Sequence, residues 1–197
     1  MRVFLDTEFT SLERPQLLSI GMVSDVGLEC YIELDLESAT GQKQIAVATP
    51  FVLVSVLGQW SRARIERNVT EHLGFAAAMW LERMAEHFDA DIELVYADKV
   101  DADLLEESLK SAGPRWSRIA PRLQWFIVSY LHGEQVVSDA MNASWASSLE
   151  QQGIGRHHAL ADARALRAGF ESMHGPSPSE VAAVSRERCG SSDERND

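Results

Sequence analysis

The sequence predicts an α/β domain in which a mixed β-sheet is flanked by helices. Its N-terminal part contains three runs that are typical of consecutive strands, and the remainder alternates helical stripes with short apolar runs. The chain has 197 residues, of which 45% are hydrophobic, enough for one sizeable core. No apolar run reaches the ~18 residues that indicate a membrane span.

Three strands are expected at the start of the chain, over residues 2–8, 16–24 and 28–36. The first two contain continuous apolar runs, and the third alternates apolar with polar residues. Asp25-Val26-Gly27 stands between the second and third strands and is typical of a tight hairpin connection. The sequence therefore predicts an N-terminal three-stranded meander.

A less regular segment follows the meander. Residues 37–48 are polar and are expected to be irregular. Thr49 and Pro50 resemble an N-cap with a proline at the first helical position, which predicts a helix to about Trp60. Residues 62–68 are basic and are expected to form a loop.

The second half of the chain alternates helices and strands. Helices are expected over residues 70–88, 101–112, 139–152 and 159–173, from their apolar stripes and from the Gly residues that follow the last three. Ile92–Tyr96 is expected to be a strand, and residues 123–131 are ambiguous with strand favoured. Residues 1–175 thus form one domain, and residues 176–197 are predicted to be a flexible polar tail.

The charge and the cysteine content limit the partners and the compartment. The formal net charge of −12 argues against strong non-specific binding to a long polyanion, so any contact with nucleic acid should be short and local. Cys30 and Cys189 lack metal-ligand spacing and are expected to be free thiols. The N-terminus has no signal-peptide pattern, and we expect a cytoplasmic protein.

Two acidic residues flank Thr7 at the end of the first strand. Residues i and i+2 of a strand point to the same face, so Asp6 and Glu8 are predicted to project side by side. Two such anions repel each other and are costly to desolvate, and a divalent cation with oxygen ligands is the usual remedy. The alternative is an edge strand whose two acids face water.

Two further motifs place acids and histidines at the starts of helices. Asp98, Asp101 and Asp103 follow the strand Ile92–Tyr96, and since an N-cap needs one acid, another could be a metal ligand. His157 and His158 precede the last helix and Asp162 lies in its early turns, near the positive helix N-terminus. The alternative for this last motif is that Asp162 only caps the helix and the histidines are solvated.

In this order the motifs resemble those of the DEDDh exonucleases, the 3′-to-5′ branch of the ribonuclease H-like superfamily. Asp-x-Glu lies on the first strand, a lone Asp followed four residues later by Leu opens a central helix, and His-x-Ala-x-x-Asp-Ala lies at the last helix. The small stand-alone bacterial exoribonucleases that begin with Asp-Thr-Glu-Phe are the most similar members. The resemblance covers residues 1–175 and departs at Val100, where the family usually has an aromatic residue.

The resemblance implies a ribonuclease H-like fold and a metal-dependent 3′-to-5′ exoribonuclease that releases nucleoside 5′-monophosphates. It implies that two Mg²⁺ ions, for which Mn²⁺ can substitute, hold the attacking and leaving oxygens in line. The implied metal ligands are Asp6, Glu8, Asp101 and Asp162. The implied general base is His157, with His158 as its competitor, because histidine side chains exchange protons near neutral pH. The alternatives are a DNA exonuclease with the same site and a ribonuclease H-like module that binds nucleic acid without cleaving it.

The resemblance also implies that Thr7, Phe9 and Thr10 contact the terminal nucleotide, although Phe9 is equally compatible with the core. Two basic runs, at residues 62–67 and 115–122, are candidate phosphate contacts, with a solvated loop face as the alternative. We also expect a homodimer, from the resemblance and from five tryptophans in a modest domain. A monomer with all five indoles in its core is the alternative.

Overall fold

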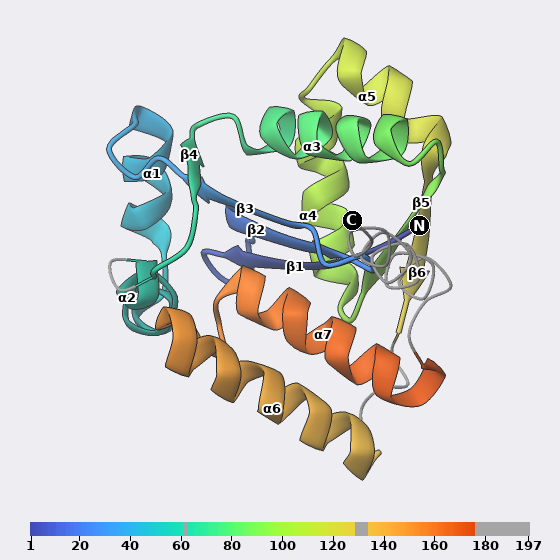
Figure 1. Cartoon of the computed structure of the whole chain (residues 1–197). Helices are drawn as coiled ribbons and strands as arrows, with labels where there is room; N and C mark the ends of the chain where they lie inside the picture. The colour runs from blue at the N-terminus through green and yellow to red at the C-terminus, as the bar shows by residue number, and fades with distance from the viewer. Residues whose placement is uncertain (61–62, 129–133, 176–197) are drawn as a thin grey trace, which may run out of the picture.

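A computed structural model describes residues 1–60, 63–128 and 134–175 of the chain. Within these residues a six-stranded mixed sheet has the strand order β4-β3-β2-β1-β5-β6 (Figure 1). Its strands are β1 (Arg2–Phe9), β2 (Leu17–Ser24), β3 (Glu29–Leu34), β4 (Asn68–Thr70), β5 (Ile92–Tyr96) and β6 (Leu123–Ile127). Helices flank both faces, which confirms the expected α/β fold of the ribonuclease H-like type.

The N-terminal meander is confirmed. Strand β1 pairs antiparallel with β2, and β2 pairs antiparallel with β3. Gly27 closes the second hairpin at a φ of 85°, a left-handed conformation that costs glycine little. The ladder between β1 and β2 shifts register at Glu8/Phe9, so β1 bends where its acidic residues lie.

Strand β1 is central to the sheet, because it pairs antiparallel with β2 on one side and parallel with β5 on the other. Every residue of β2 is buried, as expected of a strand covered on both faces. The parallel β1–β5 pair places the C-terminal end of β5, where α4 (Lys99–Lys110) begins, on the same side as the acidic end of β1. The topology thus brings two of the sequence motifs together.

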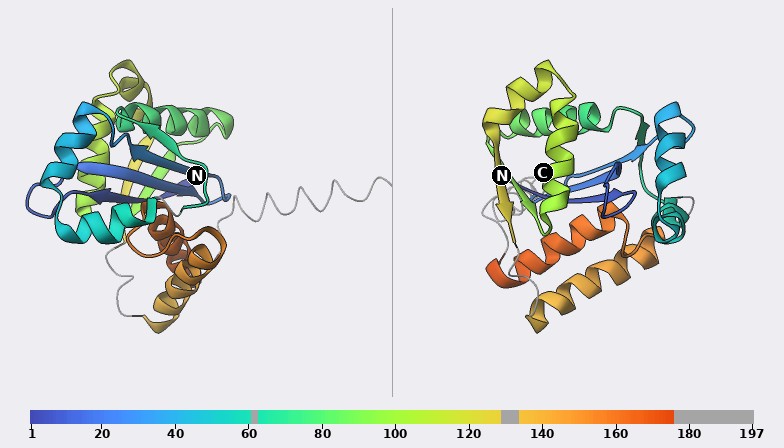
Figure 2. Two further views of the ribbon diagram at one scale, coloured as in Figure 1. Left: turned by 90° about the vertical axis from the view of Figure 1, so that its left-hand side faces the viewer. Right: turned by 180° about the vertical axis from the view of Figure 1, so that it is seen from behind.

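Two helical layers cover the sheet, as Figures 1 and 2 show from three sides. Helices α3 (Leu73–His87), α4 and α5 (Pro114–Ile119) pack together on one face over a large core. Helix α7 (Ala159–His174) lies on the other face, with α6 (Gln135–Gln152) packed along its outer side. The stripe predicted for the last helix is buried as expected: Leu160, Ala163, Leu166 and Phe170.

Gly21 allows α7 to approach the sheet closely. A Cβ atom at this position would lie 2.2 Å from the backbone carbonyl carbon of Ala159, at the first turn of α7. Gly21 pairs with Asp6 across the β1–β2 ladder, so the close contact lies beside the acidic strand. A glycine in β2 therefore sets how near the start of α7 comes to Asp6.

The first half of the chain differs from the expectation in two places. Residues 37–48 were expected to be irregular, but they contain helix α1 (Ala39–Val47), whose N-cap Ser38 accepts a hydrogen bond at Oγ from the Gly41 amide. The expectation was wrong because it relied on the polarity of the segment and overlooked Ser38 as an N-cap. The basic segment was expected to be a loop, yet its last residue opens β4, which exists through its parallel pairing with β3.

The helix expected up to Trp60 is present, but its middle turn is π-helical. The hydroxyl of Thr49 accepts a hydrogen bond from the Val52 amide at 3.4 Å, in line with the predicted cap. The π-helical segment Val52–Val56 then continues into α2 (Leu57–Trp60). Helix α5 and the 3₁₀ turn Ala120–Arg122 were not expected.

The remaining boundaries shift by a few residues. Helix α4 begins at Lys99 rather than at 101, and α6 begins at Gln135 rather than at 139. The ambiguous run at 123–131 is strand β6 as far as Ile127, while residues 129–131 lie outside the described residues. The tail expected at 176–197 also lies outside them. Within the described residues, no helix is both long and apolar enough to cross a membrane.

Candidate active site

A cavity of about 860 Å³ opens at the bent end of β1. Its acidic lining comes from β1, the segment after β1, the start of α4 and α7, and consists of Asp6, Glu8, Glu13, Asp98, Asp101 and Asp162; the loop before α7 contributes His157. Its apolar lining comes from the segment after β1, the end of α1 and the start of the π-helical segment, and includes Leu12, Val47, Phe51 and Val52. The cavity therefore combines acidic and apolar side chains.

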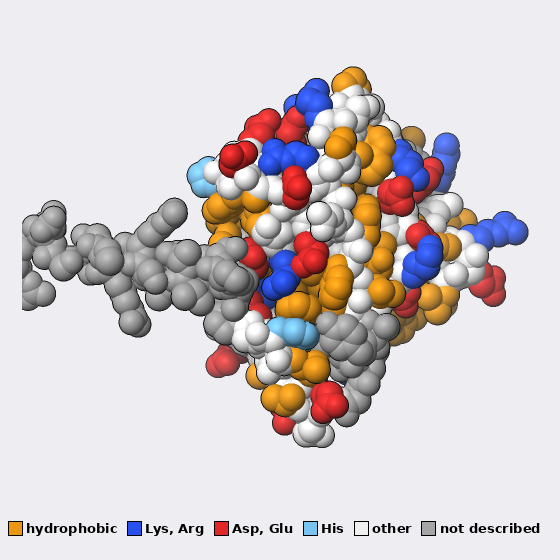
Figure 3. All heavy atoms as spheres, turned by 90° about the vertical axis from the view of Figure 1, so that its right-hand side faces the viewer, with side chains coloured by type: hydrophobic (Ala, Val, Ile, Leu, Met, Phe, Trp, Pro, Cys, Tyr) orange, Lys and Arg blue, Asp and Glu red, His pale blue; other side chains and the backbone are white. Residues whose placement is uncertain are grey.

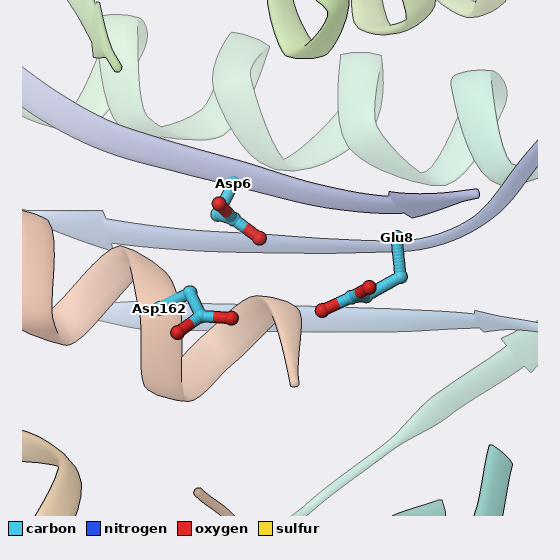
Figure 4. Close-up of side chains that lie close together, drawn as sticks. All are labelled: Asp6, Glu8 and Asp162. Carbon is cyan, nitrogen blue, oxygen red and sulfur yellow. The ribbon is translucent and has the colours of Figure 1, made fainter. Parts of the chain in front are cut away.

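Asp6, Glu8 and Asp162 converge in this cavity. Each offers a carboxylate oxygen, and these oxygens all lie within 4.8 Å of one another. Figure 4 shows Asp6 and Glu8 reaching from β1 and Asp162 facing them from the first turn of α7. The side-by-side placement predicted for Asp6 and Glu8 is confirmed, and α7 adds the third carboxylate from the opposite side.

Asp101 lies beside this triad but is held differently. Its side chain is only 5% exposed, and its Oδ1 accepts hydrogen bonds from the backbone amide (3.2 Å) and the hydroxyl (2.6 Å) of Thr7. Asp98 is the N-cap of α4, accepting from the Val100 amide, and also lines the cavity. Asp103 points outward and pairs with Lys99. Of the three acids in this motif, Asp101 is the buried one next to the triad.

The four carboxylates repel one another in a desolvated setting. Burial raises the pKa of Asp6, and the charges of Asp101, Asp162 and Glu8 raise it further. Burial likewise raises the pKa of Glu8, with Asp162 and Asp101 adding to the effect.

Hydrogen bonds offset only part of this effect at the other two acids. Burial raises the pKa of Asp101 to about 6 despite the bonds from Thr7. It raises that of Asp162 to about 6 despite a hydrogen bond from Trp145.

Among the described residues, no lysine or arginine forms an ion pair with any of these four acids. Buried carboxylates that lack a cationic partner have the oxygen-donor chemistry that Mg²⁺ and Mn²⁺ prefer. Asp6, Glu8 and Asp162 are close enough together to share one ion, and Asp101 adjoins them. The residues present therefore fit a divalent cation.

The two histidines of the last motif have different surroundings. His157 lies in the loop before α7 and lines the cavity, with its ring edge-on to Phe51 at a centroid distance of 4.9 Å. Its φ of 64° is an uncommon conformation for a non-glycine residue, and its backbone amide donates to Asp162 Oδ2 at 2.8 Å. The histidine favoured by the sequence is thus the one at the site.

His158 is fully buried and stacks with Tyr31 at a centroid distance of 4.5 Å. Burial lowers its pKa to about 4, so the ring is neutral at physiological pH. It lies behind the start of α7 and does not line the cavity. His158 therefore belongs to the core on the α7 face of the sheet.

Gln59 holds the loop that contains His157, a role that the sequence analysis did not predict. Its Nε2 donates to the carbonyl oxygens of Arg156 (2.8 Å) and His157 (3.1 Å), and its Oε1 accepts from the Gly155 amide (2.8 Å). These bonds join α2 to the loop across nearly one hundred positions of sequence. No local pattern could have indicated them.

Trp145 also contacts the acidic triad and was likewise not expected. Its indole Nε1 donates to Asp162 Oδ1 at 2.6 Å. A weak signal does exist in the sequence, because two helices joined by a short loop run antiparallel, so the late turns of α6 lie beside the early turns of α7. Trp145 and Asp162 lie on these turns.

The residues expected to contact substrate are only partly at the cavity. Thr7 and Phe9 line it, but the Thr7 hydroxyl is engaged by Asp101. Thr10 is fully buried, and its hydroxyl bonds to the backbone of the following turn. Phe9 is therefore the member of this set whose side chain remains available at the cavity.

Four arginines of the two basic runs proposed as phosphate contacts are engaged within the chain. Arg115 and Arg118 both pair with Glu82, and Arg122 donates to the carbonyl oxygens of Ala85 and Ala90. The elements that contain these arginines, α5 and the 3₁₀ turn after it, pack with α3 on the sheet face opposite α7. From the other run, Arg67 pairs with Glu33, and Arg62 lies outside the described residues.

Comparison with protein-family models finds no match to this chain, and comparison with curated proteins finds none either.

Proposed function

We propose that this protein is a metal-dependent 3′-to-5′ exoribonuclease. The observation that supports this most strongly is the convergence of Asp6, Glu8 and Asp162, with Asp101 beside them, in one cavity that also contains His157. Two Mg²⁺ ions bound by these carboxylates would hold the attacking and leaving oxygens of a phosphodiester in line. The order of the motifs along the chain is that of the DEDDh exonucleases.

In this proposal His157 is the general base. It takes a proton from a water molecule, the resulting hydroxide bonds to phosphorus, and the bond from phosphorus to the 3′-oxygen breaks. The leaving 3′-oxygen takes a proton from solvent, and His157 releases its own to solvent. The products are a nucleoside 5′-monophosphate and an RNA shortened by one residue with a free 3′-hydroxyl. A positioned base of this kind contributes ~10²–10⁴-fold to the rate. The hydrogen bonds from Gln59, and the hydrogen bond from the His157 backbone amide to Asp162, fix the loop from which His157 acts.

The apolar lining of the cavity fits a nucleobase. Leu12 and Phe51 are strongly exposed hydrophobic residues that line the same cavity as the acids. Stacking of a base on an aromatic ring stabilises binding by ~1–3 kcal/mol and tolerates any sequence. Acidic lining for the phosphodiester and apolar lining for the base suit a short single-stranded 3′ end.

The homodimer remains a prediction. The tryptophans no longer motivate it, because Trp60, Trp80, Trp116, Trp125 and Trp145 all pack wholly or partly within the subunit. A different feature supports it: β6 is an edge strand with Phe126 and Ile127 exposed, on a face where Figure 3 shows a band of hydrophobic side chains. Light scattering coupled to gel filtration would decide it, since a mass near that of one chain across a tenfold dilution excludes the dimer.

The nuclease proposal is tested with 5′-labelled RNA and DNA of one sequence, with Mg²⁺ or with EDTA. We expect a ladder of RNA shortened from the 3′ end, release of nucleoside 5′-monophosphates, and no reaction in EDTA. Asp6→Asn should be inactive, whereas Asp103→Asn, which alters an exposed acid two residues after Asp101 on α4, should retain full activity. Faster shortening of DNA would favour the DNA exonuclease, and binding without cleavage would favour the non-catalytic module.

A further inference from the structure

The carboxylate of Asp162 is held at both of its oxygens. Oδ1 accepts a hydrogen bond from the Trp145 indole at 2.6 Å, and Oδ2 accepts one from the His157 amide at 2.8 Å. A carboxylate has about four lone-pair positions, so these donors leave room for a cation. The two donors therefore fix the plane of the carboxylate while leaving it able to act as a ligand.

The indole that provides one of these donors is itself fixed by a cation. The guanidinium carbon of Arg156 lies 4.3 Å from the centroid of the Trp145 ring, within the range of a cation–π contact. Trp145 also packs against the buried cluster at the start of α7. A chain of contacts thus runs from the exposed Arg156 to the ring of Trp145, and from its indole N–H to the carboxylate of Asp162.

We propose that Trp145 is a positioning residue of the metal centre, and that its indole N–H sets the orientation of Asp162 as a ligand. Arg156 holds the ring in place for this role. The inference rests on the proposed function in so far as that function requires a cation at the triad. Hydrogen bonds from outer residues to metal ligands orient them, and their loss weakens metal binding by ~10–100-fold.

A purely structural role for Trp145 makes a different prediction. Packing against the α7 cluster and stacking with Arg156 need only an aromatic ring, and phenylalanine provides one. Trp145→Phe removes the N–H donor and keeps most of the ring. If Trp145 only fills space, this substitution should change stability and leave cation affinity unaltered.

The direct test follows the indole N–H itself. In ¹H–¹⁵N spectra of the uniformly labelled protein, the Trp145 indole signal is identified by its loss in Trp145→Phe. We expect a strong downfield position in the metal-free protein, because the donor bonds to a carboxylate. Titration with Mg²⁺ should shift this signal with the same dissociation constant that calorimetry gives. An indole signal that stays unchanged while calorimetry reports binding would overturn the inference.

The second test compares affinities. Calorimetry with Mn²⁺ should give a dissociation constant ~10–100-fold higher for Trp145→Phe than for the wild type. Trp80→Phe, which alters an indole on the α3 side of the sheet, should bind as the wild type does. The RNA-cleavage rate of Trp145→Phe should recover at saturating Mn²⁺, because the residue acts on binding of the ion. A Trp145→Phe affinity within twofold of the wild type also overturns the inference.

Failure of the inference and failure of the proposed function are separable. If the wild type binds Mn²⁺ and Trp145→Phe binds it equally well, the metal centre stands and the role of Trp145 is lost. If the wild type binds no Mn²⁺ at all, the metal centre fails and the inference fails with it. If Trp145→Phe does not fold, the indole signal of Trp145 is assigned in the wild type by triple-resonance experiments instead, and its titration still decides.

Discussion

Replacing Asp6 with asparagine should stabilise the metal-free protein while removing its response to Mg²⁺. Asp6 is crowded by Asp101, Asp162 and Glu8, and burial with these charges raises its pKa. Asn keeps the shape of the side chain and carries no charge to desolvate. Like-charge repulsion at the triad therefore falls, and the metal-free fold gains stability.

The size of the gain can be worked from a neighbouring acid. Burial raises the pKa of Asp101 from 3.8 to about 6, and roughly two pKa units correspond to ~3 kcal/mol of cost for a fully ionised group. We expect Asp6→Asn to recover a comparable amount, on the order of 1–3 kcal/mol. For a domain of this size that raises Tm by ~3–10 °C.

The sign of the pH dependence follows from the direction of the shift. A raised pKa means that the folded protein holds protons that the unfolded chain releases, so stability falls as pH rises through the raised value. The advantage of Asp6→Asn should therefore be large at pH 7.5 and small at pH 4, where the acids are protonated in the fold. Thermal melts in EDTA at these two pH values measure the difference.

Adding Mg²⁺ provides the second half of the assay. The wild type should gain stability at pH 7.5, because a ligand that binds only the folded state raises Tm. Asp6→Asn should gain much less. Asp103→Asn is the matched control, with a change within ~0.5 kcal/mol in either condition, because its i,i+4 ion pair is exposed. A destabilised Asp6→Asn in EDTA at pH 7.5 would refute the reasoning.

Three further substitutions separate the parts of the site. His157→Ala should lower the rate of RNA cleavage by ~10²–10⁴-fold with Mn²⁺ affinity nearly unchanged. His158→Ala should mainly lower Tm. An inactive but well-folded His158→Ala would instead identify His158 as the general base. Gln59→Leu removes the hydrogen bonds to the loop before α7 and should lower the rate of RNA cleavage at saturating metal by up to ~10²-fold. A wild-type rate would show that Gln59 is not needed to position this loop. Gly21→Ala should lower the free energy of unfolding by at least ~1–3 kcal/mol and weaken Mn²⁺ binding, because the added Cβ would push the start of α7 away from the sheet. An unchanged Tm would contradict the close approach of Gly21 to Ala159.

Local patterns predicted the parts of the fold that depend on local order. The bounds of β5 are those expected, and alternation along β1 placed Asp6 and Glu8 on one face. Asp101 is buried whereas Asp103, two residues later on α4, lies outward, as the helical period requires. These predictions succeeded because a strand period of two and a helix period of 3.6 are properties of the backbone itself.

The features that were missed depend on contacts between distant segments. Strand β4 has three residues and is defined by its pairing with β3, which no window of sequence contains. Arg115 and Arg118 were candidates for phosphate binding, but Glu82 on α3 pairs with both. Gln59 hydrogen-bonds a loop almost one hundred residues away. Such contacts follow from the assembled fold, so residue type and spacing could not reveal them.

The most direct measurement for the central claim is the position of Mn²⁺ in crystals of the wild-type protein, located by its anomalous scattering. The account predicts a peak within bonding distance of carboxylate oxygens of Asp6, Glu8 and Asp162, about 2.0–2.3 Å as expected of oxygen ligands to small divalent ions. The peak should be absent from Asp6→Asn crystals soaked in the same way. A saturating soak that leaves the triad without an ion, or that places Mn²⁺ only elsewhere on the protein, would contradict the account.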